Sequence, residues 1–205
     1  MVSEQIQPLN SLGPVDGKPA GQEEEIIKDP AKRDYKEGRD FLKNGELSQA
    51  AVCFHNALKG FEEQNDELGI ANASDRLGDV CLEKEEYQMA VDHYLRARAI
   101  CERKDDSFSA LALNKKLAVC YRRIGQLDKA LEVLFDILDH YKMVRNPQGT
   151  VQILEVIADV YMEKGDNSAA ADAYRTAASI HANFRHKRLA REFEERADQV
   201  EQGQG

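Results

Sequence analysis

Cysteine and histidine are the residues of this chain that could carry nucleophilic, redox or metal chemistry. The cysteines are Cys53, Cys81, Cys101 and Cys120. A thiolate acts as a nucleophile or a zinc ligand when it lies exposed in an electropositive setting or is paired at CxxC spacing. None of the four has such a partner in the sequence, so we interpret them as reduced thiols without redox or metal function.

The histidines do not complete a reactive arrangement either. His55 lies two residues from Cys53, and residues two apart on a helix do not face each other, which argues against a Cys–His dyad. The sequence contains no Gly-rich phosphate loop, HExxH motif, nucleophile elbow or calcium loop. We therefore predict that the chain is not an enzyme and binds no metal or cofactor, and we rank an enzymatic role last among the alternatives.

Composition argues against further classes of function. The 205 residues include 37 acidic and 28 basic side chains, which gives a formal charge of -9. Nucleic-acid binding needs a basic face, so we predict no nucleic-acid partner. No apolar run approaches the roughly 18–20 residues that a membrane span requires. The first residues also lack the pattern of a secretory signal, so we predict no membrane span and a cytoplasmic location.

The sequence predicts that these residues lie in a mostly helical chain. Residues 1–28 are rich in Gly, Pro, Ser, Gln and Glu without periodicity, which predicts a flexible arm. Asp29-Pro30 is typical of a helix start, with Asp as N-cap and Pro at the first helical position. From there to about Gln199 the pattern is helical almost throughout.

The chain resembles itself when it is shifted by 40 residues. Small residues recur in two columns, which are Gly38, Gly78, Ala118 and Ala158, and Ala50, Ala90, Ala130 and Ala170. Large residues recur beside them, at Phe41, Cys81, Tyr121 and Tyr161, and at Phe54, Tyr94, Leu134 and Tyr174. Small residues let two helix backbones approach closely and large residues fill the space beside them. Each unit is therefore predicted to be a pair of antiparallel helices.

Two further columns predict the turns. The column between the helices of each pair holds Gly45, Glu85, Gly125 and Gly165. The column before each following helix holds Asp66, Asp106, Asn146 and His186. Glycine in the first column favours a left-handed C-cap. Asp and Asn in the second predict N-caps, and His is a poorer one.

Most of the candidate reactive residues fall in packing columns of this repeat. Residues that share a column with aliphatic or aromatic side chains of other repeats are Cys81, Cys120, His93, His140 and His181. A buried cysteine behaves as a small hydrophobe, and a partly buried histidine usually finds one polar partner. We therefore predict packing roles for them.

This small–large–Gly–Ala–aromatic–Ala pattern resembles the tetratricopeptide repeat (TPR) family. The matches are Leu77-Gly78, Cys81, Tyr87, Ala90, Tyr94 and Ala97 in the second repeat, and Ile157-Ala158, Tyr161, Gly165, Ala170, Tyr174 and Ala177 in the fourth. The usual period of the family is about 34 residues, and this chain lacks both its Trp and the Pro that commonly ends its second helix. A second helix that runs on by about one turn gives a period similar to that of the forty-residue class. The resemblance implies an all-α fold, a right-handed superhelical solenoid of antiparallel helix pairs.

The predicted organisation follows from the repeat. It comprises a flexible arm at 1–28, a solenoid at 29–201 and a tail at 202–205, with repeats at about 31–64, 66–104, 106–144 and 146–182 and a capping helix at 186–201. The last helix mixes basic and acidic residues. We interpret it as a solvated cap on the apolar end of the solenoid, in preference to a basic docking surface.

In a TPR array the first helices of successive units line a concave groove, so the resemblance implies a partner site there. The predicted groove residues are Tyr35, Lys36, Arg39, Asn72, Asp75, Arg76, Asp79, Lys115, Lys116, Val119, Arg122, Glu155 and Asp159. Charge alternates from repeat to repeat along rows of this set. Ion pairs between repeats, worth about 0–1 kcal/mol each when exposed, explain the alternation, and so does a groove for a peptide that carries both signs. Both interpretations stay open.

One row of the groove is uniformly basic and invites comparison with the carboxylate clamp of chaperone-binding TPR proteins. The row is Lys36, Arg76 and Lys116. Asp75 and Asp79 crowd it, and Ala112 stands where the clamp has a lysine, so we reject a chaperone clamp.

The predicted function is a scaffold or adaptor that binds another protein or peptide in the groove. The alternatives are a chaperone for a secreted or assembling client and a peptide-sensing regulator. A homo-oligomer stays open as well. The arm, through segments such as residues 6–9 or 23–27, is a further candidate occupant of the groove, because a tethered segment has a high effective concentration.

Overall fold

The computed structural model describes residues 28–203. Within this part of the chain there are helices and turns and no strand. The helices are α2 (Pro30–Lys43), α3 (Leu47–Gln64), α4 (Glu67–Glu83), α5 (Tyr87–Arg103), α6 (Ser107–Arg123), α7 (Leu127–Met143), α8 (Pro147–Lys164), α9 (Asn167–Asn183) and α10 (Lys187–Glu201). Apart from Lys28, the predicted arm lies outside the described residues, as do residues 204–205 of the predicted tail.

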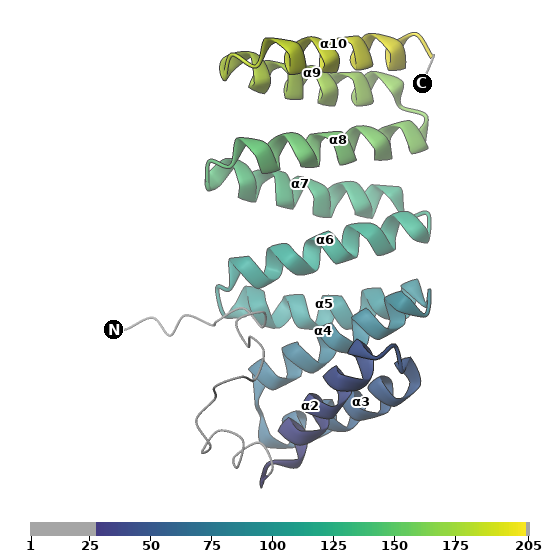
Figure 1. Ribbon diagram of the computed structural model, residues 1–205, viewed down its shortest axis with the longest axis vertical. Helices are drawn as coiled ribbons and strands as arrows, with labels where there is room; N and C mark the ends of the chain where they lie inside the picture. Colours follow the sequence, from purple (N-terminus) through teal and green to yellow (C-terminus); the bar gives the residue numbers. More distant parts are fainter. Residues whose placement is uncertain (1–27, 204–205) are drawn as a thin grey trace, which may run out of the picture. The chain divides into compact units, whose positions relative to one another are not determined.

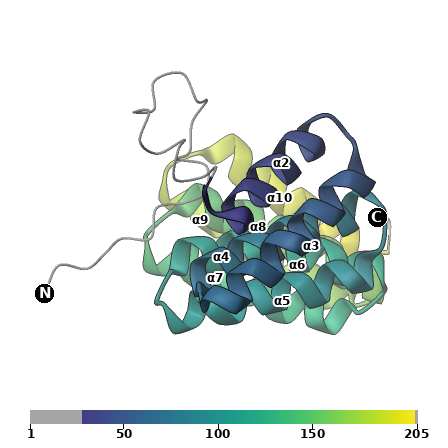
Figure 2. The same cartoon turned by 90° about the horizontal axis from the view of Figure 1, so that it is seen from below.

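The chain divides into two compact units, and the division falls inside α6, between Lys116 and Leu117. In the first unit each helix from α2 to α5 packs against the next, and in the second unit each helix from α7 to α10 does the same. Figure 1 shows α7 to α10 stacked in chain order, and Figure 2 shows α2 beside α3. This consecutive packing confirms an all-α fold of helix pairs. The handedness of a superhelix stays a prediction.

The helix boundaries repeat with the period that the sequence predicts. The first helices of successive pairs, α4, α6 and α8, begin at residues 67, 107 and 147, and α10 begins at residue 187. The second helices, α3, α5, α7 and α9, begin at residues 47, 87, 127 and 167. Both series advance by 40 residues, as expected for lengthened tetratricopeptide-type repeats.

The turn inside each helix pair contains one residue in the left-handed region. Gly45, Gly125 and Gly165 have φ values of 78°, 73° and 78°, and Glu85 adopts φ 60° in the same column. Glycine reaches this conformation without a Cβ clash, which confirms the predicted C-caps. Each turn between successive pairs also contains one residue in the left-handed region, and none of these residues is glycine. They are Asn65, Asp105, Arg145 and Arg185. Asn65 and Asp105 are residue types that enter the left-handed region more readily than most, whereas the sequence gives no such signal at Arg145 and Arg185.

The N-caps also follow the predicted column. The Asp29 carboxylate accepts a hydrogen bond of 3.0 Å from the backbone N–H of Ala31, and Pro30 occupies the first turn. Equivalent bonds of 2.9–3.0 Å run to the N-cap side chains of Asp66, Asp106 and Asn146. His186 makes no side-chain cap bond, in agreement with its expected weakness as a cap.

Close backbone approach explains the column of small residues. A Cβ on Gly78 would lie 2.4 Å from Cε1 of Tyr94, and a Cβ on Gly38 would lie 2.8 Å from Cδ1 of Phe54. Both rings are fully buried. A glycine here therefore lets α5 or α3 place a large ring against the preceding helix, and this packing holds each pair together.

Helix α10 ends the second unit. Its Phe193, Ala197 and Val200 are buried, and α10 packs on α9. The ring of His181 on α9 stacks on Phe193 with centroids 5.3 Å apart. The exposed face of α10 carries charged residues, including Arg188 and Arg191.

Candidate functional site

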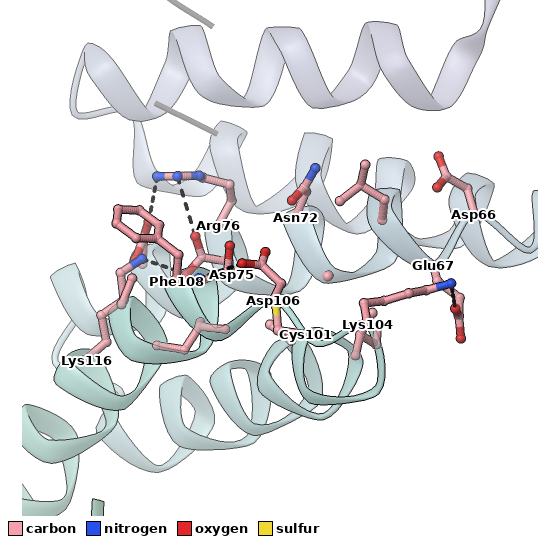
Figure 3. A pocket seen from close by; sticks show the side chains of 18 of the residues that line it. Asp66, Glu67, Asn72, Asp75, Arg76, Cys101, Lys104, Asp106, Phe108 and Lys116 are labelled. Carbon is pink, nitrogen blue, oxygen red and sulfur yellow. Dashed lines mark hydrogen bonds and ion pairs between the residues drawn. The ribbon is translucent and has the colours of Figure 1, made fainter. Parts of the chain in front are cut away.

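A cleft of about 730 Å³ opens between α4, α5 and α6 in the first unit (Figure 3). Helix α4 contributes Asn72, Asp75, Arg76 and Asp79 to the lining, since side chains three or four residues apart share one face of a helix. Helices α5 and α6 contribute apolar side chains, among them Ala97, Ile100, Leu113 and Phe108. The cleft therefore has an apolar wall and a polar end.

The polar end is a cluster of two carboxylates and two cations. The Lys116 ammonium on α6 lies 2.6 Å from Asp75 Oδ1 and 2.7 Å from Asp79 Oδ1 on α4. The Arg76 guanidinium lies 2.8 Å from Asp79 Oδ2 and 3.4 Å from Asp75 Oδ2. These side chains are at most 28% exposed, so water screens the pairs far less than surface pairs. We call this set, together with Tyr94, the first cluster.

Tyr94 anchors the first cluster from α5. Its hydroxyl donates a 2.9 Å hydrogen bond to Asp79 Oδ1, and the Lys116 ammonium lies 5.2 Å from the centre of its ring. The first cluster thus ties α4, α5 and α6 together through one acceptor, Asp79. A charge-assisted hydrogen bond of this kind is stronger than one between neutral groups.

Burial and neighbouring charges shift the proton affinities in the first cluster. Burial raises the pKa of the Asp75 carboxyl, and the Asp79 carboxylate raises it further, against the lowering effect of Lys116 and Arg76. Burial acts to lower the pKa of Arg76, but Asp75 and Asp79 outweigh it and raise that pKa. Tyr35 lies near Arg76, and burial raises the pKa of its hydroxyl.

The rim of the cleft carries exposed groups that are available to a partner. Phe108 is 63% exposed and Leu68 is 48% exposed, and both line the cleft. The Asn72 side chain lines it too and makes no hydrogen bond to any described residue. An aromatic ring, an aliphatic side chain and an open amide are groups that bind an extended peptide by apolar contact and hydrogen bonding.

The same arrangement recurs in the second unit, 80 residues further along the chain. Tyr174 on α9 donates a 3.4 Å hydrogen bond to Asp159 on α8, and Arg196 on α10 donates a 2.7 Å bond to Glu155. The Arg196 guanidinium also lies 4.4 Å from the centre of the Tyr174 ring. We call Glu155, Asp159, Tyr174 and Arg196 the second cluster.

The predicted groove residues divide between the two units. Those that line the cleft are Asn72, Asp75, Arg76, Asp79 and Lys116. Those of the first unit that do not line it are Tyr35, Lys36, Arg39 and Lys115. Those of the second unit are Val119, Arg122, Glu155 and Asp159. Of these last four, Arg122 pairs with Glu163, and Glu155 and Asp159 belong to the second cluster.

The uniformly basic row does not present three free cations. Arg76 and Lys116 are paired with Asp75 and Asp79, whereas Lys36 is exposed. Between α4 and α6 the alternating charges form ion pairs between neighbouring first helices, which is one of the two interpretations of the alternation.

Several lining residues were not predicted from the sequence. Among them are Asp66, Glu67, Leu68, Cys101, Lys104, Asp106 and Phe108. Leu68 and Phe108 share a column with Gln148 and Arg188, so that column shows no common residue type that would mark it as a site. Their exposure in the first turns of α4 and α6 becomes evident only when the helices are placed.

The cysteines and histidines that were predicted to be packing residues are buried or half-buried. Cys81, Cys101 and Cys120 are buried, Cys53 is half-buried, and none of the four is in a disulfide bond. Burial raises the pKa of the Cys101 thiol to about 11, which disfavours the thiolate. His93, His140 and His181 are half-buried, and His55 is exposed. Among the described residues, no three His, Cys, Asp or Glu side chains gather in a group that could hold a metal ion.

The helices of the described part of the chain are also too short or too polar to cross a membrane.

Two family models match the chain, and both describe the tetratricopeptide repeat. One matches residues 35–107 and the other residues 151–184, so together they cover about half of the chain. The first match contains most of the residues that line the cleft. No curated protein sequence matches significantly.

Solved structures share the fold at low sequence identity. The TPR-like repeats of a putative kinesin light chain from Podosopora anserina align with a TM-score of 0.67 and 17% identity, over 85% of this chain and 89% of that one. The apo form of RapI aligns with a TM-score of 0.63 and 15% identity, over 83% of this chain and 64% of that one. A Rap protein in complex with Competence and Sporulation Factor aligns with a TM-score of 0.54 and 15% identity, over 85% of this chain and 53% of that one.

The family matches, the repeated helix pairs and these structural neighbours agree with one another. The chain belongs to the tetratricopeptide repeat family.

Proposed function

We propose that this protein is a non-catalytic interaction scaffold and that the cleft between α4, α5 and α6 binds an extended segment of a partner protein. The observation that carries the proposal is the cleft itself, which combines an apolar wall with an open amide and a charged end. Its volume of about 730 Å³ is in the range of sites that accommodate several side chains.

The charges of the first cluster favour a scaffold over a catalyst. Both cations are already paired with carboxylates, and the Tyr94 hydroxyl donates to Asp79. A general base or nucleophile needs a free group aimed at a substrate. The first cluster instead fixes α4, α5 and α6 in position, and a rigid site loses less entropy when it binds.

The chemistry of the rim indicates the kind of segment. Phe108 and Leu68 supply apolar contacts, and the Asn72 amide can hydrogen bond to a peptide backbone in either direction, because it both donates and accepts. The likeness to a Rap protein that was solved with Competence and Sporulation Factor supports the idea that this fold accommodates a ligand. The segment expected here is extended, and it carries at least one apolar side chain that contacts Leu68 and Phe108.

Site-specific photo-crosslinking tests the proposal. A benzophenone amino acid replaces Ala112, which is exposed and lines the cleft, and in a matched variant it replaces Gln152, the exposed residue one repeat later that does not line the cleft. Crosslinking in native lysate is followed by mass spectrometry. We expect a partner that is captured from position 112 and not from position 152. Equal capture from both positions, or capture from neither, would contradict a partner site in the cleft.

A further inference from the structure

The turns between helix pairs form one edge in each unit, and the two edges have opposite charge. The first-unit edge consists of residues 62–67 and 102–107, and the second-unit edge consists of residues 142–147 and 182–187. In the first unit the two segments touch, since Glu67 lies 2.9 Å from Arg103 and 2.7 Å from Lys104. In the second unit, Figure 1 shows the α7–α8 and α9–α10 turns on the same side.

The two edges lie at the same positions of the forty-residue repeat, yet their formal charges differ strongly. The acids of the first-unit edge are Glu62, Glu63, Asp66, Glu67, Glu102, Asp105 and Asp106, and its bases are Arg103 and Lys104, so its formal charge is -5. The second-unit edge contains no acid, and its bases are Lys142, Arg145, Arg185 and Lys187, so its formal charge is +4. In a chain of net charge -9, the acid-free edge is a basic patch on an acidic protein.

Large apolar side chains are exposed in the second-unit edge and directly beside the first-unit edge. In the second-unit edge Met143 is 72% exposed, Val144 53% and Phe184 55%. Directly beside the first-unit edge, Leu68 and Phe108 are 48% and 63% exposed. Exposed apolar groups that are surrounded by charge of one sign are typical of a surface that binds a partner of opposite sign.

The charges of the edges are only partly satisfied within the chain. Arg145, Arg185 and Lys187 form no ion pair with any described residue. On the first-unit edge Glu63 and Asp105 form none with the described residues either, although Glu67 is paired with Arg103 and Lys104. Folding of the described part therefore leaves unpaired charge of opposite sign on the two edges.

We propose that the protein associates with a second copy of itself, and that the second-unit edge of one copy binds the first-unit edge of the other. Two observations favour a second copy as the partner, namely the opposite charges of the two edges and the shared repeat geometry on which both edges are built. Both edges are built on the same positions of the forty-residue unit, so their turns are spaced by the same helix-pair geometry. Unpaired Asp105 of one copy and Arg145 of the other occupy equivalent left-handed positions. Each edge thus presents opposite charge at matching intervals.

Every copy carries one edge of each sign. Two copies that pair twice form a closed dimer, whereas copies that pair once at each edge form an open chain. Leu68 and Phe108 also line the cleft, so association at the first-unit edge covers the outer rim of the cleft. This association does not depend on the proposed binding of a partner in the cleft.

Sedimentation velocity of the full chain tests the proposal. We expect a mass that rises with concentration and an association constant that falls at least about tenfold between about 50 mM and about 500 mM NaCl, because salt screens charged surfaces. The variant Arg145→Glu with Arg185→Glu should be monomeric at the low salt concentration. Glutamate is acceptable at a left-handed position of this chain, as Glu85 shows. Circular dichroism establishes that the variant is folded.

Two controls make the test specific. The variant Lys59→Glu with Arg123→Glu makes the same charge change at exposed positions outside both edges and should associate like the wild type. A first-edge variant, Glu63→Arg with Asp105→Arg, should be monomeric alone and should associate when it is mixed with the second-edge variant. A wild-type chain that stays monomeric at low salt, or edge variants that are folded and still associate, would overturn the proposal. Binding of the monomeric wild type to phosphatidylserine vesicles through Arg145 and Arg185 would instead assign the edge to a lipid surface.

Discussion

The first and second clusters occupy the same repeat positions, 80 residues apart, and differ in two residues that change their character. Arg76 of the first cluster corresponds to Val156 beside the second, so the first has two cations for two carboxylates and the second has only Arg196. Gly78, against which Tyr94 packs, corresponds to Ala158. The tyrosine hydroxyl lies 2.9 Å from its aspartate in the first cluster and 3.4 Å in the second.

The repeat sets the architecture of both clusters, and single residues set the strength of the interactions in each. Without a Cβ at residue 78, the Tyr94 ring comes close to α4 and its hydroxyl reaches Asp79. With Ala158, the longer hydroxyl contact is supplemented by the Arg196 guanidinium, which lies over the Tyr174 ring. The first cluster is therefore a balanced set of buried charges at the end of a cleft, and the second is an ion pair with a cation–π contact.

Replacing the equivalent aspartates of the two clusters, Asp79 and Asp159, should reveal the largest difference in stability between the clusters. Asp79→Ala leaves Arg76 and Lys116 with one carboxylate and deprives the Tyr94 hydroxyl of its acceptor, so we expect a loss of about 3–5 kcal/mol in the free energy of unfolding. Asp159→Ala removes one long hydrogen bond, for which we expect a loss of about 0.5–1.5 kcal/mol. Urea unfolding followed by circular dichroism measures both. Equal losses would show that the first cluster is not the stronger one.

A substitution in the column of small residues should have the next largest effect on stability. Gly78→Ala places a Cβ 2.4 Å from the Tyr94 ring and should cost about 1–3 kcal/mol of unfolding free energy through overpacking. Leu134 occupies the ring position beside Ala118 in the third repeat, so Tyr94→Leu should relieve the clash. A double-mutant cycle should therefore show favourable coupling between Gly78→Ala and Tyr94→Leu. Additive costs would mean that the ring and the glycine do not compete for this space.

The smallest expected effect is a change in stability with pH. The pKa of Asp75 is raised above its ordinary value of 3.8, so the folded chain binds this proton more tightly than the unfolded chain. The stability of the wild type relative to Asp75→Asn should therefore fall as pH rises from below 3.8 to the raised pKa, and stay level above it.

Asp29 provides a control, because its pKa is shifted in the opposite direction and its effect on stability should therefore have the opposite pH dependence. Burial acts to raise its pKa, but hydrogen bonds from Gln64, Lys32 and Ala31 outweigh burial and lower it. The stability of the wild type relative to Asp29→Asn should fall as pH drops through that lowered pKa. Urea unfolding of the three proteins at a series of acidic pH values measures both differences. Slopes of the same sign would contradict the environment described for Asp75.

Much of the fold could be predicted because each repeat position carries a local physical signal. Glycine at residues 45, 125 and 165 indicates a left-handed turn, and Asp66, Asp106 and Asn146 indicate helix starts. The left-handed conformation of Arg145 and Arg185 could not be predicted, because arginine has no preference for the left-handed region and packing imposes the conformation.

The candidate site was only partly predictable for a related reason. Asp75, Arg76, Asp79 and Lys116 were predicted because they stand at equivalent positions on first helices, and the structure brings these four together. The rim residues Leu68 and Phe108 were missed, since exposure and spacing across α4 and α6 depend on tertiary packing. The sequence also did not show that Arg76 and Lys116 neutralise Asp75 and Asp79, because two alternating signs fit both a binding groove and internal ion pairs.

The central claim, a partner site in the cleft, is tested most directly by the affinity of the purified chain for a protein captured from position 112. Isothermal titration calorimetry should compare the wild type with Ala112→Arg, which adds a long charged side chain to the lining of the cleft, and with Gln152→Arg, which adds the same side chain at the equivalent exposed position outside it. We predict that Ala112→Arg weakens binding at least about tenfold, or about 1.4 kcal/mol, and that Gln152→Arg leaves it unchanged. Equal affinity of the wild type and Ala112→Arg would contradict the claim.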